Sequence, residues 1–141
     1  MKSCYKIALA TTVLVLGSAL PVLSQIDTGM DFTTSFPFYA GNAKMPAGSY
    51  KITQTDVDAN ELLIQSADGK YSAFVDFFPT RSEQPHKQSD VTFQKYGSVD
   101  YLDRIWVEGQ RYGMRVDPTR AEKKAAANAS PVEHPIVGKK H

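Results

Sequence analysis

Short segments in which apolar and polar residues alternate are the feature that most limits how this chain can fold. They recur between residues 32 and 116, and the clearest of them span residues 32–38, 91–96 and 99–107. Alternation with a period of two is typical of half-buried β-strands. The segments are separated by close-set turn signals, of which Asp68-Gly69 is the strongest hairpin signal. We therefore predict an all-β domain, an antiparallel meander that forms a small β-sandwich or barrel.

Two positions in these segments predict local irregularities. Pro37 cannot donate a hydrogen bond to a neighbouring strand, so the strand over residues 32–38 is expected to lie at a sheet edge or to end there. The pair Phe77-Phe78 interrupts the alternation of the strand over residues 71–78. We expect either a β-bulge at this pair or a strand that is covered on both faces.

The pattern changes after Asp117. This residue is a favourable N-cap and Pro118 suits the first helical position, so a helix is expected to follow. Residues 119–127 are rich in alanine but have little apolar periodicity, which predicts a marginal helix that buries little surface. Residues 130–141 contain two prolines, and we predict a disordered tail.

The first 24 residues have the features of a cleavable export signal. Lys2 and Lys6 precede a charge-free apolar run over residues 7–20, and Pro21 precedes a cleavage point between Ser24 and Gln25. The apolar run has about 14 residues whereas a membrane span needs roughly 20, which favours cleavage over the alternative of an uncleaved anchor. We therefore predict export to the periplasm or the medium, with no stable membrane span after cleavage.

The predicted organisation is a signal peptide over residues 1–24, a β domain over residues 25–117, and a helix with a flexible basic tail over residues 118–141. The single cysteine, Cys4, lies in the signal segment, so the exported domain is predicted to hold together without disulfides, by burial of apolar surface. Residues 25–117 carry nine Lys or Arg and thirteen Asp or Glu, a net charge of −4. An acidic body argues against nucleic acid as a partner, because phosphate binding needs a concentrated basic surface.

No pattern in the sequence predicts a metal site, a cofactor or a catalytic nucleophile. The segment over residues 56–60 begins like a calcium loop, but it lacks the glycine and the glutamate that such a loop requires at later positions. The three histidines (His86, His134 and His141) are too few and too dispersed for a zinc site without cysteine. The least excluded catalytic arrangement is a pair of carboxylates. The candidates are Asp76, Asp100, Asp103 and Glu108.

The segment over residues 101–107 is the densest in aromatic and charged side chains. Its alternation places Leu102, Arg104 and Trp106 on one face, with apolar residues on both faces. We expect a central strand, with Tyr101, Arg104 and Trp106 as candidate binding residues, because Trp and Tyr combine a large contact area with one polar group. The alternative is that these aromatic rings belong to the core and that Arg104 pairs with a neighbouring acid.

Several short motifs occur in an order that resembles a group of small exported β-domain proteins of the acidobacterial type. They are Phe36-Pro37-Phe38, Gly41, Met45-Pro46-Ala47-Gly48-Ser49-Tyr50, Asp68-Gly69, the segment 91–97 and the segment 101–106. The resemblance covers residues 31–117, and its motifs fall at predicted turn and core positions. It implies a β domain and no particular activity.

The sequence thus predicts a non-enzymatic exported β domain with a binding or scaffolding role and a partner in the envelope or outside the cell. One alternative is a small barrel that holds an apolar ligand in its mouth. The cavity would then be lined by Phe32, Phe36, Tyr50, Phe74 and Phe93. A second alternative is a carboxylate-dependent hydrolase that acts on an envelope glycan.

Overall fold

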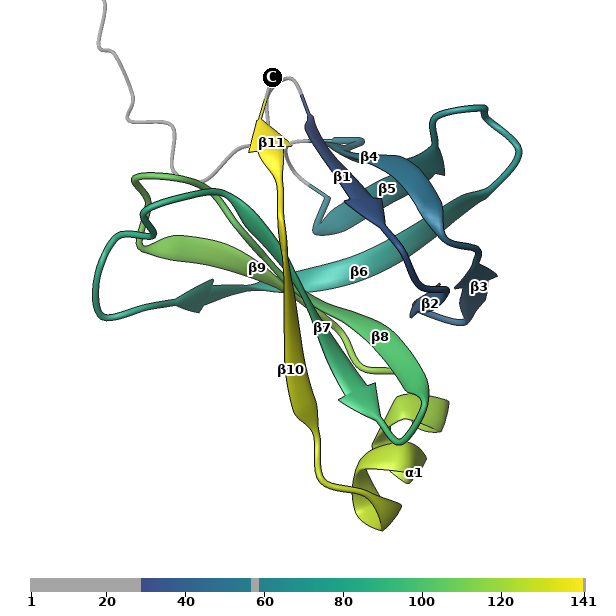
Figure 1. The fold of residues 1–141 in the computed structure, drawn as a ribbon. Coiled ribbons are helices and arrows are strands. Elements are labelled where there is room, and N and C mark those ends of the chain that lie inside the picture. The colour runs from purple at the N-terminus through teal and green to yellow at the C-terminus, as the bar shows by residue number, and fades with distance from the viewer. Residues whose placement is uncertain (1–28, 57–58, 141) are drawn as a thin grey trace, which may run out of the picture.

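The computed structural model describes residues 29–56 and 59–140, which form eleven strands and one helix (Figure 1). The strands are β1 (Met30–Thr34), β2 (Phe38–Ala40), β3 (Ala43–Met45), β4 (Gly48–Gln54), β5 (Glu61–Ser66), β6 (Ser72–Arg81), β7 (Asp90–Tyr96), β8 (Val99–Trp106), β9 (Tyr112–Val116), β10 (Val132–Val137) and β11 (Lys139–Lys140). The helix α1 (Arg120–Asn128) follows β9. The predicted all-β class is confirmed, as is the C-terminal helix. The predicted signal peptide lies outside the described residues.

The strands form one sheet that folds over on itself like a sandwich and does not close. The hydrogen-bonded order is β10-β7-β8-β9-β6-β5-β4-β1-β11, and the β2–β3 hairpin joins it through a parallel pairing of β2 with β8. The strands β4 to β6 and β7 to β9 are each a meander, but β9 rather than β7 lies beside β6. The arrangement therefore contains two meanders and one parallel pair instead of a single antiparallel meander.

The long strand β6 links the two halves of the sheet. Residues 72–76 pair with β5, and residues 77–81 pair with β9 (Figure 1). Phe77 faces the core and Phe78 is exposed, so the alternation continues through this pair. The expected bulge or double coverage is therefore wrong at Phe77-Phe78. The strand exchanges one partner for another at this point, as strands do where a sheet turns a corner.

The C-terminal segment is ordered as strands, which corrects the prediction of a disordered tail. β10 pairs with β7 along its whole length, and β11 pairs with β1, so this one segment spans both ends of the sheet (Figure 1). Ile136 packs against the core. Gly138 lies where an added Cβ would approach the Met30 sulfur to 2.8 Å. The composition of the segment favoured disorder, but an unpaired β7 edge would leave backbone groups without partners.

The helix α1 begins two residues later than predicted. Thr119 is the N-cap, and its hydroxyl accepts a hydrogen bond from the Glu122 amide at 3.2 Å. The amide of Asp117 instead donates to the Asp76 carbonyl at 2.9 Å, which extends the pairing of β9 with β6. The backbone of Asp117 thus continues the pairing with β6 beyond the end of β9, and the side chain of Thr119 caps the helix instead.

Aromatic rings fill the interior of the sandwich. Phe93 is fully buried, and its ring centroid lies 5.0 Å from that of Phe38, 5.3 Å from that of Phe36 and 6.1 Å from that of Phe32. Phe74, by contrast, points away from the core and is 61% exposed. Four of the five aromatic residues proposed to line a ligand cavity (Phe32, Phe36, Tyr50 and Phe93) pack against one another, and Phe74 lies outside, so these five rings do not form the wall of one common cavity.

Candidate functional site

The three predicted binding residues lie on β8, but the structure does not bring them into one site. Tyr101 is 8% exposed, and its ring lies against those of Tyr39 and Tyr96, at centroid distances of 5.4 Å and 5.9 Å. Trp106 is 6% exposed and lies at the other end of the strand. Arg104, by contrast, lines a cavity. The two aromatic residues are therefore covered by other parts of the chain rather than free for a partner.

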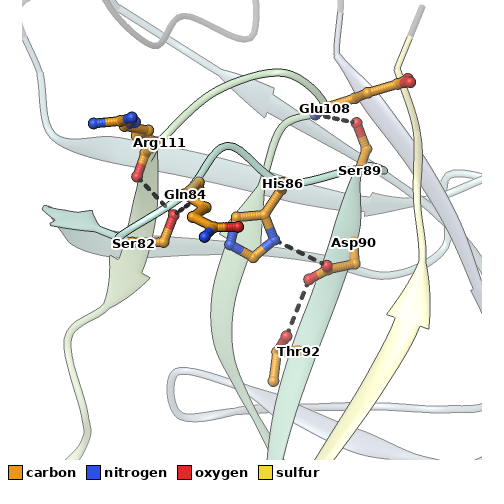
Figure 2. Close-up of polar contacts among 8 residues, drawn as sticks. All are labelled: Ser82, Gln84, His86, Ser89, Asp90, Thr92, Glu108 and Arg111. Atoms are coloured by element: carbon orange, nitrogen blue, oxygen red, sulfur yellow. Dashed lines mark hydrogen bonds and ion pairs between the residues drawn. The ribbon is translucent and has the colours of Figure 1, made fainter.

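The cover over Trp106 is the loop between β6 and β7. The ring of His86 stacks on the indole at 4.1 Å with an angle of 12° between the planes. Figure 2 shows His86 beside the Asp90 carboxylate, which lies 3.5 Å from its Nδ1. The hydroxyl of Ser82 donates to the Gln84 carbonyl, and the hydroxyl of Ser89 accepts from the Glu108 amide. Both serine hydroxyls thus bond to the backbone of the loop and of the β8–β9 turn. This cluster holds the loop in place, and its hydroxyls are engaged in that role.

A β-bulge at Asp103 changes which way the β8 side chains point. Thr92 of β7 pairs with Arg104, whereas the next residue, Phe93, pairs with Leu102, so Asp103 is the extra residue. Leu102 therefore faces the core, although the alternation had placed it on the same face as Arg104. Bulges commonly redirect side chains in this manner, and they are frequent next to functional sites.

Two arginines face each other on neighbouring strands beside this bulge. Arg104 of β8 pairs directly with Arg115 of β9, and like charges in this position repel one another. The Nε atom of each arginine is buried and makes no hydrogen bond to the described residues. The Arg104 Nε does lie 3.3 Å from an oxygen of Asp103, but in an ion pair whose direction does not meet hydrogen-bond geometry. The pair thus has unused donor capacity.

The first turn of α1 places a buried carboxylate beside this arginine pair. Glu122 is 7% exposed, and burial raises its pKa to about 7. The nearby Asp103 raises the pKa further, whereas Arg115 and the hydrogen bond from the backbone act against the shift. The pKa of Tyr96 is also raised, first by burial and then by Glu122 and Asp103. Titratable groups with shifted pKa values in one concave place are a recognised sign of a functional site.

These side chains line one cavity of about 300 Å³, which we name the helix cleft. The residues of the helix cleft that matter here are Gln94, Tyr96, Asp103, Arg104, Arg115 and Glu122. Asp103 accepts a hydrogen bond from the Gln94 amide at 3.3 Å, which holds the bulge residue in place. The cleft offers guanidinium donors for an anionic group, and it holds two carboxylates that differ in environment.

Four of the six named members of the helix cleft were not predicted as site residues: Gln94, Tyr96, Arg115 and Glu122. Glu122 lies three residues after Thr119, the spacing of a helix capping box, so its place in the first turn can be read from the sequence. Its burial cannot, because it depends on where α1 packs against the sheet. Arg115 gives no local signal at all, since its importance comes from pairing with Arg104.

The part of the chain that the structure describes contains neither a cluster of metal ligands nor a membrane-spanning helix. Among residues 29–56 and 59–140 there is no group of three or more His, Cys, Asp or Glu side chains that could hold a metal ion. Within the same residues no helix has the length and apolar character needed to cross a membrane. Comparison of the chain with protein-family models, with curated proteins and with solved structures found no match.

Proposed function

We propose that this chain is an exported, non-enzymatic β domain that binds an anionic group of its partner in the helix cleft. The observation that carries the proposal is the facing pair Arg104 and Arg115, whose buried Nε atoms have no hydrogen-bond partner among the described residues. Buried donors without partners are costly in a folded protein. Planar guanidinium groups are well suited to carboxylate or phosphate oxygens. An anionic ligand would supply both the missing acceptors and the missing charge.

The charge balance of the helix cleft supports an anionic ligand. Arg104 and Arg115 bring two positive groups to the cavity wall, and Lys123 adds a third. Against these stand Asp103 and Glu122, and a pKa of about 7 leaves Glu122 only partly ionised at neutral pH. Positive charge therefore exceeds negative charge in the cleft, although the body of the domain is acidic.

Export is part of the same proposal. It is supported by the basic start, apolar run and cleavage point within residues 1–24. A partner in the periplasm or outside the cell follows from this route. The net charge of −4 over residues 25–117 speaks against nucleic acid, since one arginine pair does not make the broad basic surface that a phosphate backbone needs.

The proposal predicts saturable binding of simple anions at the arginine pair. We expect the Nε–Hε signals of Arg104 and Arg115 in NMR spectra to shift on titration with acetate or inorganic phosphate at constant ionic strength. The double variant Arg104→Gln, Arg115→Gln should lose this binding, because it removes both charges. The variant Arg115→Lys keeps the charge but lacks the planar donor, and it should bind at least about tenfold more weakly.

The matched control is Arg81→Gln, which removes an arginine of β6 that lies outside the helix cleft. Arg81 lies over the ring of Tyr112 at 5.6 Å, much as Arg115 lies over that of Phe78 at 5.5 Å. This control should bind anions like the parent protein. Shifts that do not saturate, or that persist in a folded double variant, would show that the arginine pair is no binding site.

A carboxylate-dependent hydrolase is the second candidate, and one observation favours it. Asp103 and Glu122 share the helix cleft, and a carboxyl group with a pKa of about 7 is suited to act as a general acid. The other predicted carboxylates do not join this pair. Asp100 lies 3.3 Å from His134 on the β10 side, and Asp76 is exposed on β6.

The hydrolase candidate predicts release of reducing ends from isolated envelope glycan, with the rate highest near pH 7 or below. The variants Glu122→Gln and Asp103→Asn should each reduce that rate at least about a hundredfold, the usual contribution of a general acid or base. The exposed-loop variant Glu83→Gln is the control and should keep the parent rate. No release by the parent protein between pH 5 and pH 8 removes this candidate and leaves the binding role.

A further inference from the structure

The arginine pair belongs to a row of side chains that continues beyond the helix cleft. Across four neighbouring strands, Thr92 pairs with Arg104, Arg104 with Arg115, and Arg115 with Phe78. The guanidinium of Arg115 lies 5.5 Å from the centre of the Phe78 ring. Phe78 is 40% exposed. The row thus leads from polar side chains under α1 to an aromatic ring on the open surface, with Arg115 between the two.

A second exposed ring, that of Phe74, lies on the same face of β6. Phe74 precedes Phe78 by four residues, which places the two rings about 13 Å apart along the strand. Phe74 is 61% exposed, and the exposed Asp76 lies between the two on this face. Single exposed aromatic residues need no explanation. Here Phe78 stands beside an arginine pair that has unused donors, and Phe74 lies further along the same strand, so the surface has an apolar part next to an anion-binding part.

We propose that this surface binds an acidic oligosaccharide, with a sugar ring on Phe78 and its carboxylate on Arg104 and Arg115. The inference rests on the proposed anion-binding function and names its ligand class. A pyranose offers an apolar C–H face that packs on an aromatic ring, and its hydroxyl groups suit Gln94 and Tyr96 in the helix cleft. Phe74 then contacts a sugar unit further along the chain.

The same features argue against other anionic ligands. A fatty acid needs an apolar groove for its chain, whereas the helix cleft has a volume of only about 300 Å³ and five charged residues in its lining. An extended peptide pairs with the free edge of a sheet, but Arg115 lies on β9, which is hydrogen-bonded to β6 on one side and to β8 on the other. An acidic sugar requires only a ring face, hydroxyl partners and a site for one carboxylate.

The test compares three probes by isothermal titration calorimetry: a galacturonic acid trimer, the neutral trimer maltotriose, and acetate. We expect the acidic trimer to bind at least tenfold more tightly than either of the others, since only it uses both parts of the surface. Phe78→Ala should weaken the acidic trimer about tenfold and leave acetate unchanged. Arg115→Gln should weaken both, and the exposed-ring control Tyr112→Ala should weaken neither.

The outcomes separate this inference from the function on which it rests. If acetate and the acidic trimer bind equally well, or if Phe78→Ala has no effect on the trimer, the sugar inference is wrong and the anion site stands. If neither probe binds, both proposals fail. Because Phe78 is on the surface, its alanine variant is expected to fold, and its thermal unfolding checks this.

Discussion

The variant Glu122→Gln is expected to be more stable than the parent protein at pH 8 and to lose most of the dependence of stability on pH. In the parent, burial raises the pKa of Glu122 from 4.5 to about 7. The folded protein therefore binds a proton that the unfolded chain has released between these two pH values. Its free energy of unfolding falls as the pH rises through this window and is level above about pH 7.

The size of the effect follows from the width of that window. One pKa unit corresponds to about 1.4 kcal/mol, so the parent should lose as much as about 3 kcal/mol between pH 4.5 and pH 7. A neutral glutamine has the same shape and no charge to bury, so the variant should not show this loss. The expected gain for the variant at pH 8 is a large part of the same amount, reduced by the lost attraction to Arg115.

Urea unfolding at pH 5, 6, 7 and 8 measures this difference, with Trp106, the only tryptophan, as the fluorescent probe. The exposed-loop variant Glu83→Gln is the control and should follow the pH dependence of the parent. If the free energy of unfolding of the Glu122 variant fell with pH as steeply as that of the parent, this carboxylate would not be held in the buried site between α1 and the sheet. The measurement thus tests the helix cleft without any ligand.

The parts of the fold that were predictable are those that depend on neighbouring residues. Alternation around Phe93 and Ile105 marks β7 and β8, and both side chains are fully buried. The Asp68-Gly69 hairpin between β5 and β6 also follows from local chemistry, since Gly69 has a φ of +76° that other residues resist. Signals of this kind need only a few residues, so one sequence is enough to find them.

The parts that were not predictable depend on contacts between distant segments. The pairing of β6 with β9 rather than β7 sets Phe78 beside Arg115, and no local pattern encodes it. The bulge at Asp103 is invisible in a segment whose two faces are both rich in large side chains. The helix cleft combines both effects with the docking of α1, so of its members only Arg104 was a predicted binding residue and only Asp103 a predicted carboxylate.

The C-terminal strands are the clearest case in which a composition argument and the fold disagree, and their removal is the second large expected effect. A chain that ends at Ala129 lacks β10 and β11. It loses the pairing of β10 with β7, the packing of Ile136 on the core, and the stacking of His134 on Phe36 at 4.3 Å. It also uncovers the edge of the core at Phe93.

We expect this truncation to lower the free energy of unfolding by at least about 4 kcal/mol, from lost apolar burial and from several lost hydrogen bonds. A loss of this size is most of the stability of a marginal domain, so the truncated chain should be largely unfolded or aggregated. The milder control ends at Gly138 and removes β11 while keeping β10 and the glycine beside Met30. It should remain folded.

Circular dichroism and urea unfolding of the two truncated chains decide between an ordered strand and a free tail. If the chain that ends at Ala129 were as stable as the full domain, β10 would contribute nothing, and the expectation of a disordered tail would be right. The expected unfolding of this truncated chain would instead show that residues 132–137 are part of the folding unit. The sheet then depends on a segment that follows α1 in the chain, and the helix that covers the cleft is held between two strands rather than at a free end.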